Sequence, residues 1–181
     1  WYYCLKQRGG IGALALEFLS LTLARSGEVR GAVWSEFEDD IWIIPANRTK
    51  TKTEYRIPLS RRALDLLKEL DHQQELLFPN KYGRELSDAS LLACMKRIHY
   101  QNDDRFVDRH SGRPAVPHGL RSTFRDWVTE NTEYPSEMAE IALGHKVGNA
   151  VERAYRRGDM LKKRQMMMED WGKFLMSATN D

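Results

Sequence analysis

Residues 117–127 read Pro-His-Gly-Leu-Arg-Ser-Thr-Phe-Arg-Asp-Trp, a stretch that combines a helix-start signal with polar side chains at helical spacing. Pro117 suits the first turn of a helix, so we expect a helix that continues to Trp127. His118 and Arg121 lie three positions apart and therefore share one face of that helix. An imidazole and a guanidinium on one face contribute little to an apolar core, so the pair is a candidate functional site.

Three further polar side chains stand at or beyond the ends of predicted helices. Residues 11–24 are rich in Ala and Leu and predict a buried or amphipathic helix, which leaves Arg25 at its end. A second, short helix is expected over residues 136–144, capped by its first residue, and His145 follows it directly. Tyr155 lies ten residues after His145, next to two arginines.

A small antiparallel sheet is predicted in the first third of the chain. Residues 32–37 and 41–44 carry β-branched and aromatic side chains separated by acidic turn residues, which is typical of a hairpin. Residues 55–59 alternate in polarity and predict a third strand. The polar loop before this third strand contains Lys50 and Lys52.

The remainder of the chain is predicted to be helical. Ser60 and Ser87 are suited to cap helices over residues 61–70 and 88–100. A polar loop, a short helical piece and a final amphipathic helix are then expected at residues 101–115, 151–157 and 160–176. The fold class is therefore α+β and mainly α-helical, with a small three-stranded antiparallel sheet.

Length and composition predict one globular domain. The chain has 181 residues, of which 41% are hydrophobic and 30% charged. It contains no apolar run close to the roughly 20 residues that span a bilayer, and its start does not resemble a signal peptide. Cys4 and Cys94 are far apart and match no metal or redox motif, so we expect free thiols in a reducing cytoplasm.

The net charge of +2 does not by itself indicate a nucleic-acid partner. The cations are nevertheless clustered, at residues 48–52, 61–62, 153–157 and 162–164. Such clusters are usually solvated surface, and contact with phosphates becomes the better interpretation only when a motif supports it.

Four segments together supply that motif, because the chain resembles the tyrosine recombinases, most closely the integrases of P4-like phages and genomic islands. The segments are residues 24–34, residues 44–50 with 56–60, residues 118–127, and residues 142–145 with 152–159. A single His-x-x-Arg would be weak, whereas four segments in the family's order cover nearly the whole chain. The resemblance implies the fold of DNA breaking-rejoining enzymes. It also implies that residues 1–181 are one catalytic domain, with the upstream core-binding and arm-binding domains absent from this piece.

The resemblance also assigns roles. Tyr155 would be the nucleophile that forms a 3′-phosphotyrosine, and Lys50 would protonate the departing 5′ oxygen. His118 and His145 would donate hydrogen bonds to the phosphate, with His118 also a candidate base for the tyrosine proton. Arg25 and Arg121 would bind the non-bridging oxygens, Glu28 would hold Arg25 or a neighbouring group in place, and DNA would be contacted by Arg48, Lys52, Arg156 and Arg157.

These residue types suit the chemistry. A phosphodiester is anionic, and planar guanidiniums hold its oxygens while staying charged at any working pH. A phenol with a pKa of about 10 needs neighbouring cations to attack at neutral pH, and a lysine pKa of about 10.4 falls beside two arginines. Because the covalent link conserves the bond energy, neither ATP nor a cofactor is expected, and the cations replace a divalent metal.

Some alternatives stay open on the sequence alone. Lys52 competes with Lys50 as general acid, although the spacing favours Lys50. Tyr55 replaces a histidine that is common in the P4-like group, and we expect little consequence from it. The rival functions are a catalytically silent DNA-binding module, a type IB topoisomerase, and a metal hydrolase using His110, His118 and His145, for which no spacing is diagnostic.

The expected partner is double-stranded DNA at attachment sites, bound by a homotetramer in the bacterial cytoplasm at the nucleoid. An excisionase and a host DNA-bending protein are further candidate partners, and no membrane is expected. The final helix is expected to dock either on its own core or on a neighbouring protomer.

Overall fold

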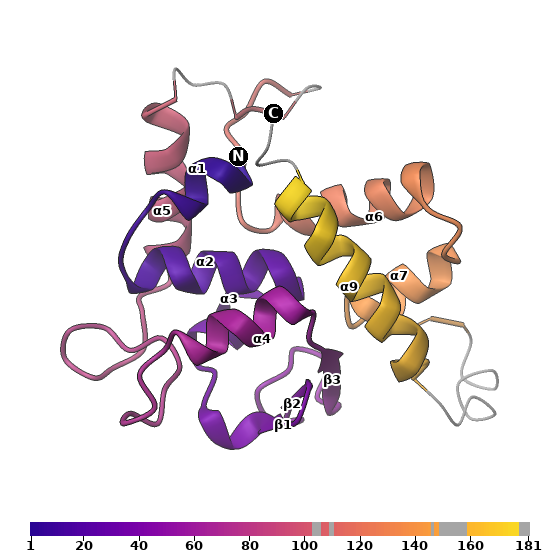
Figure 1. Cartoon of the computed structure of the whole chain (residues 1–181), viewed down its shortest axis with the longest axis horizontal. Helices are drawn as coiled ribbons and strands as arrows, with labels where there is room; N and C mark the ends of the chain where they lie inside the picture. The colour runs from indigo at the N-terminus through magenta and orange to yellow at the C-terminus, as the bar shows by residue number, and fades with distance from the viewer. Residues whose placement is uncertain (103–105, 109–110, 146, 149–158, 178–181) are drawn as a thin grey trace.

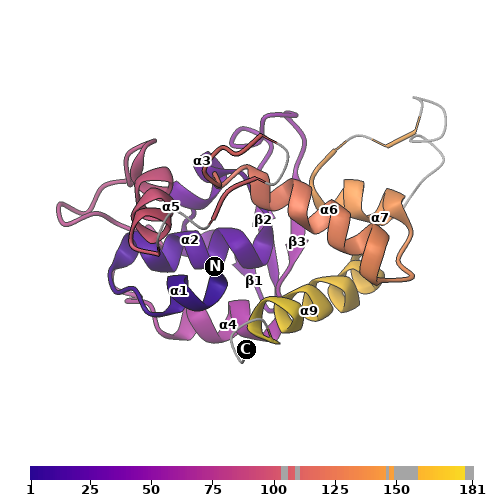
Figure 2. The ribbon, with the colours of Figure 1, turned by 90° about the horizontal axis from the view of Figure 1, so that it is seen from above.

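The computed structural model describes residues 1–102, 106–108, 111–145, 147–148 and 159–177 (Figure 1). Elements of residues 2–100 form one group, and elements of residues 119–177 pack against one side of it (Figure 2). None of the helices in the described ranges combines the length and the apolar character needed to span a membrane.

Helix α2 (Ile11–Thr22) lies at the centre of the first group. Nine of its twelve residues are buried, as expected for a helix that is apolar on nearly all sides. It contacts five other helices: α1 (Tyr2–Lys6), α3 (Ser26–Arg30), α4 (Arg61–Lys68), α5 (Ser90–Tyr100) and α9 (Leu161–Ser177). The predicted helix over residues 11–24 is confirmed, and Leu23 ends it with a left-handed φ of 58°.

A buried carboxylate on α2 joins three helices. Glu17 accepts hydrogen bonds from the Tyr2 hydroxyl at 2.8 Å, from Lys6 Nζ at 3.1 Å and from Arg62 Nε at 2.8 Å. Burial alone raises the pKa of a carboxyl group, but these donors outweigh it and lower the pKa of Glu17. The charge of Glu17 therefore ties α1 and α4 to the central helix.

The three-stranded antiparallel sheet is present in the order β1-β2-β3. It consists of β1 (Phe37–Glu38), β2 (Ile41–Ile44) and β3 (Tyr55–Pro58), with Trp42 opposite Ile57 and Ile44 opposite Tyr55. The Trp42 ring stacks on Phe37 with centroids 5.6 Å apart, and it also contacts Phe18 of α2. This packing fixes the sheet against the central helix.

The predicted strand over residues 32–37 is wrong. Residues Trp34–Glu36 form a 3-10 helix, η1, and only Phe37 and Glu38 pair with β2. The backbone just before η1 bonds instead to a distant loop, through Leu77 N to Ala32 O at 2.9 Å and Trp34 N to Glu75 O at 3.1 Å. The backbone of this segment therefore pairs with residues 75–77, which are remote in sequence.

The helical predictions hold with shifts at the ends. Ser60 caps α4 as predicted, because its hydroxyl accepts from Ala63 N at 3.4 Å. Ser87 does not cap α5, which begins at Ser90 with Ala89 at the N-cap, so that prediction is wrong. Ser87 Oγ instead lies 2.8 Å from Ser90 Oγ.

The second group consists of α6 (Gly119–Asn131), α7 (Ser136–Ala142) and α9. The residue before α7, Pro135, occupies its N-cap, so Ser136 starts the helix rather than capping it as predicted. An aromatic cluster joins α6 to α9: the rings of Phe124 and Trp127 each lie 5.3 Å from that of Trp171. The helical piece predicted at residues 151–157 lies outside the described residues.

Helix α9 packs on the core of its own chain. Trp171 is fully buried and donates a hydrogen bond from Nε1 to Ser20 O at 2.8 Å. Gly172 lies so close to α4 that an added Cβ would be 3.0 Å from Ser60 Oγ and 3.1 Å from Ser60 Cβ. In this single chain the last helix lies on its own core, and docking on a neighbouring protomer stays a prediction.

We predict that Gly172→Ala destabilises the protein by about 1–3 kcal/mol, because the added methyl overpacks the α4–α9 contact. The matched control is Gly12→Ala in α2, where a Cβ meets nothing within 4 Å. That control should stabilise by about 0.4–1 kcal/mol through the lost flexibility of the unfolded chain. Urea unfolding measures both variants, and equal midpoints would contradict the predicted close packing.

Candidate active site

Arg25 is held at the junction of two helices. It lies two residues after the left-handed Leu23 and adopts an extended conformation, with φ −75° and ψ 151°, as the N-cap of α3. The Glu28 carboxylate accepts from Arg25 N at 2.7 Å and from Arg25 Nη1 at 3.0 Å. Glu28 is only 3% exposed, so one buried carboxylate fixes both the backbone and the guanidinium of Arg25.

Arg121 is buried between the ends of two helices. Its Nη1 donates to Leu23 O and its Nη2 to Leu143 O, and these residues are the C-caps of α2 and α7. Burial first, and then the positive charge of Arg25, lower the pKa of Arg121. A guanidinium nevertheless stays charged in proteins, so the fold keeps two cations together.

His145 lies beside Arg121. Gly144, with φ +65°, ends α7 in the left-handed conformation that favours glycine. The turn places His145 Nε2 3.2 Å from Arg121 Nη2. On the other side of the ring, Nδ1 lies 2.6 Å from a carboxylate oxygen of Glu140. Arg25, Arg121 and His145 are thus gathered from helix ends that are far apart in sequence.

His118 is the N-cap of α6 and is exposed. Its carbonyl oxygen accepts from Arg121 N at 3.2 Å, so the two residues are joined through the backbone of the first turn. No side-chain hydrogen bond caps α6 at this position, so the imidazole does not serve as a helix cap.

The loop that contains the predicted general acid is anchored at its base. Thr49 is buried, and its hydroxyl donates to Thr53 O at 2.8 Å and accepts from Thr53 N at 3.1 Å. Lys50 and Lys52 are both exposed on this loop, and Lys52 has a φ of 54°. Neither position is excluded by this geometry, so the preference for Lys50 stays a prediction.

Arg48, predicted to contact DNA, points toward α3. Its Nη1 pairs with the Glu36 carboxylate, and its Nη2 donates to Glu28 O at 2.7 Å. The same Glu36 accepts from Trp42 Nε1 at 2.9 Å. Arg48 therefore links the β2–β3 loop to the residue that holds Arg25, and its contact with DNA stays a prediction.

Tyr55 is more important to the site than the sequence indicated. Its hydroxyl donates to Ala142 O, and its ring packs against Gly144, where an added Cβ would lie 3.4 Å from Tyr55 Cζ. Burial raises the pKa of Tyr55 to about 12, although Arg164 and Arg121 oppose the shift. Tyr55 therefore supports the turn that carries His145, and the consequence of having tyrosine at this position stays a prediction.

Tyr155, Arg156 and Arg157 lie outside the described residues, as does His110. The position of the predicted nucleophile therefore stays a prediction. Within the described ranges, no three His, Cys, Asp or Glu side chains are grouped so that they could hold a metal ion.

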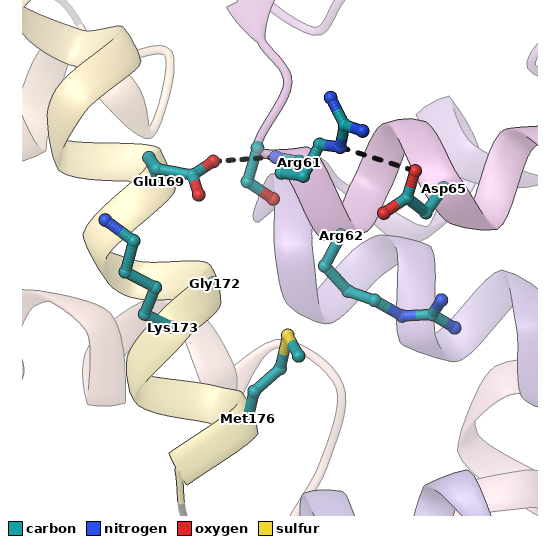
Figure 3. Close-up of a pocket in the computed structure, with 8 residues that line it drawn as sticks. Arg61, Arg62, Asp65, Glu169, Gly172, Lys173 and Met176 are labelled. Atoms are coloured by element: carbon teal, nitrogen blue, oxygen red, sulfur yellow. Dashed lines mark hydrogen bonds and ion pairs between the residues drawn. The ribbon is translucent and has the colours of Figure 1, made fainter.

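A separate groove lies between α4 and α9 (Figure 3). It has a volume of about 190 Å³. Its charged groups have local partners: the backbone N–H of Arg61 donates to the Glu169 carboxylate at 2.7 Å, and Arg61 Nε lies 3.6 Å from the Asp65 carboxylate. None of the predicted catalytic residues lines it. The candidate active site is therefore the cluster around Arg121 and not this groove.

Solved structures share the fold. A lambda integrase (75–356) dimer bound to a COC′ core site matches with a TM-score of 0.61 and 22% identity, covering 87% of this chain and 56% of that one. The XerH site-specific recombinase bound to difH substrate, in a pre-cleavage complex, matches with a TM-score of 0.58 and 19% identity, covering 84% and 50%. At these identities the likeness concerns the fold alone.

Related sequences are more informative. Prophage integrase IntA of Escherichia coli (strain K12) is 33% identical over 165 residues, covering 87% of this chain and 37% of IntA. The integrase of Enterobacteria phage P4 is 29% identical over 182 residues, covering 90% of this chain and 39% of that protein. The chain thus spans about two fifths of the length of these relatives. Since the phage integrase family model also matches residues 9–162, the chain belongs to the phage integrase family.

Proposed function

We propose that this chain is the catalytic domain of a tyrosine site-specific recombinase, which cuts and rejoins DNA through a 3′-phosphotyrosine on Tyr155. The observation that carries the proposal is the buried Arg121, held by Leu23 O and Leu143 O next to the charge of Arg25. Among the described residues no carboxylate forms a salt bridge with Arg121. A buried cation whose described partners are two carbonyl oxygens and a histidine nitrogen, all uncharged acceptors, favours an anionic ligand, and a DNA phosphate is one.

The site is preorganised for the transition state of phosphoryl transfer. Glu28 fixes Arg25 and two helix ends fix Arg121, so neither guanidinium has to be ordered when the phosphorus becomes pentacoordinate. Donors held in place at the developing negative charge supply a large part of the catalysis in such enzymes. His118 and His145, in the first turn of α6 and after α7, are the further candidate donors.

The chemical step balances with residues of this chain. The Tyr155 oxygen bonds to phosphorus, the bond to the 5′ oxygen breaks, and Lys50 delivers a proton to that leaving oxygen. The phenol proton goes to a base, for which His118 is the candidate. Rejoining is the reverse attack by a 5′ hydroxyl, which regenerates the phenol and conserves the phosphodiester.

The wider assignment rests on the relatives. We propose that residues 1–181 form one domain of a longer integrase that integrates or excises a prophage or genomic island. The solved lambda integrase structures include a tetramer bound to a Holliday junction, which supports action on attachment-site DNA as a homotetramer. We further propose an excisionase and a host DNA-bending protein as partners, and the bacterial nucleoid as the place of action.

Tyr155→Phe should abolish covalent adducts with DNA while leaving DNA binding largely intact, because only the nucleophilic oxygen is removed. The measurement uses a nicked suicide substrate that prevents religation, followed by gel separation and mass spectrometry of the trapped peptide. The control is Tyr82→Phe, at a tyrosine that is 73% exposed on a surface loop. A wild-type chain that binds DNA but forms no adduct would indicate a silent DNA-binding module.

Arg121→Ala should lower the cleavage rate by at least about 3 kcal/mol of transition-state stabilisation, which is a hundredfold or more. Because Arg121 also holds two helix ends, Arg25→Ala provides a second test at a more exposed guanidinium, with a side chain 24% exposed. The control is Arg61→Ala, 74% exposed on α4, for which we expect the wild-type rate. Relaxation of any plasmid, rather than exchange between two specific sites, would favour a type IB topoisomerase.

Lys50→Ala should slow cleavage of ordinary DNA and be rescued by a substrate with sulfur in place of the bridging 5′ oxygen. The reason is that a thiolate leaves without the proton that the lysine supplies. Lys52→Ala is the matched variant on the same loop. Sulfur rescue of Lys52→Ala instead of Lys50→Ala would transfer the role of general acid to Lys52.

A further inference from the structure

Glu140 contacts His145 and Arg125 with its two carboxylate oxygens. One oxygen lies 2.6 Å from His145 Nδ1, and the other lies 2.6 Å from Arg125 Nε. Glu140 belongs to α7 and Arg125 to α6, one turn after Arg121. His145 Nε2 in turn lies 3.2 Å from Arg121 Nη2. A series of contacts therefore runs from the exposed Arg125 through Glu140 and His145 to the buried Arg121.

The contacts of His145 define where its proton lies. A guanidinium has N–H donors and no acceptor, so the short contact to Arg121 requires His145 Nε2 to accept. The single proton of the neutral ring then sits on Nδ1 and is donated to Glu140. A second contact, from His145 N to Glu140 O at 3.0 Å, fixes the backbone of the same turn.

We propose that Glu140 is a positioning residue that keeps the His145 proton on Nδ1 and thereby aims Nε2 at the phosphate site beside Arg121. This inference rests on the proposed recombinase function and assigns Glu140 a role that the sequence did not reveal. When a phosphate binds, a proton taken up from solvent at Nε2 would form a hydrogen bond to a phosphate oxygen, while Nδ1–H remains with Glu140. Both N–H groups of the protonated ring would then have an acceptor.

Only a carboxylate at position 140 offers an oxygen acceptor to each of two neighbouring donors. His145 Nδ1–H and Arg125 Nε–H are both donors, and each needs an oxygen of residue 140. The amide of Gln has one oxygen, and the charged guanidinium of Arg125 is the stronger competitor for it. The NH₂ group of Gln would then face Nδ1, force the proton to Nε2 and set two donors against each other at Arg121.

The test compares three variants with the wild-type chain. Glu140→Leu removes both acceptors, and Glu140→Gln leaves one. Both should lower the population of the Nδ1–H tautomer of His145, because a ring that Glu140 no longer holds is free to turn away from Arg121. Cleavage of a suicide substrate should slow by about tenfold to a hundredfold, the range found for residues that orient a metal-binding histidine. The double variant Glu140→Gln with Arg125→Leu removes the competing donor, so the amide oxygen can turn to Nδ1 and both the tautomer and the rate should recover.

Two readouts separate this role from a structural one. The ring ¹⁵N shifts of His145, assigned by their loss in His145→Ala, report the tautomer in the free protein and do not require DNA. If Glu140 merely joined α6 to α7, the double variant would be slower than Glu140→Gln alone, and that result would overturn the proposal. Unchanged tautomer and rate in Glu140→Leu would overturn it as well.

A cycle with His145 completes the test. In a His145→Ala background, Glu140→Leu should cause no further loss of rate, because Glu140 acts through the ring. An additional loss of tenfold or more in that background would contradict the assignment. Failure of the wild-type chain to form any adduct would instead count against the recombinase function, while the ¹⁵N result would still decide the placement of the proton.

Discussion

The site depends on one buried guanidinium that, in the part of the chain that the structure describes, is held by helix ends and not by a carboxylate. Arg121 is 4% exposed and donates to the C-cap carbonyls of α2 and α7. The C-terminus of a helix carries a partial negative charge, which stabilises a cation without neutralising it. Arg121 is therefore fixed in position and still available to an anion, which a full salt bridge would not allow to the same degree.

Carboxylates are present in this part of the fold, but those of Glu28, Glu36 and Glu140 contact polar groups other than Arg121. Glu28 holds Arg25, Glu36 holds Arg48, and Glu140 faces His145. The arrangement orders the polar groups of the site while the central guanidinium keeps its charge. Tyr55 contributes in the same way without charge, since its hydroxyl bonds to Ala142 O and its ring supports Gly144.

Local patterns predicted most of the fold. The apolar run of α2, the alternation of β3 and the Ser60 cap are properties of contiguous residues, and each was found where it was expected. The strand expected at residues 32–37 was not, because Ala32 and Trp34 bond to a loop some forty residues later. Propensity reports what a segment favours, and it cannot report which remote backbone is its partner.

Some residues of the candidate site could likewise be predicted from the sequence, and others could not. Arg25, Arg121 and His145 were found because they recur at the spacing of a known family, since none of them is distinctive alone. Glu140 and Tyr55 were missed because their importance lies in contacts across elements, from α7 to the turn after it and from β3 to α7. For Glu140 the only local signal is its place five residues before His145, a spacing that many carboxylates on surface helices share.

The net charge did not indicate a DNA partner, because it depends on composition and not on contacts within the fold. The 28 basic residues nearly balance the 26 acidic ones. That sum also counts cations that already form salt bridges within the protein. Arg30, Arg62 and Arg164 are largely buried and paired with carboxylates. Lys50 and Lys52, by contrast, are exposed, and Arg121 is held by carbonyls. A polyanion responds to local potential and not to the total. A nearly neutral chain can therefore present a strongly cationic site, provided that the fold pairs the other arginines elsewhere.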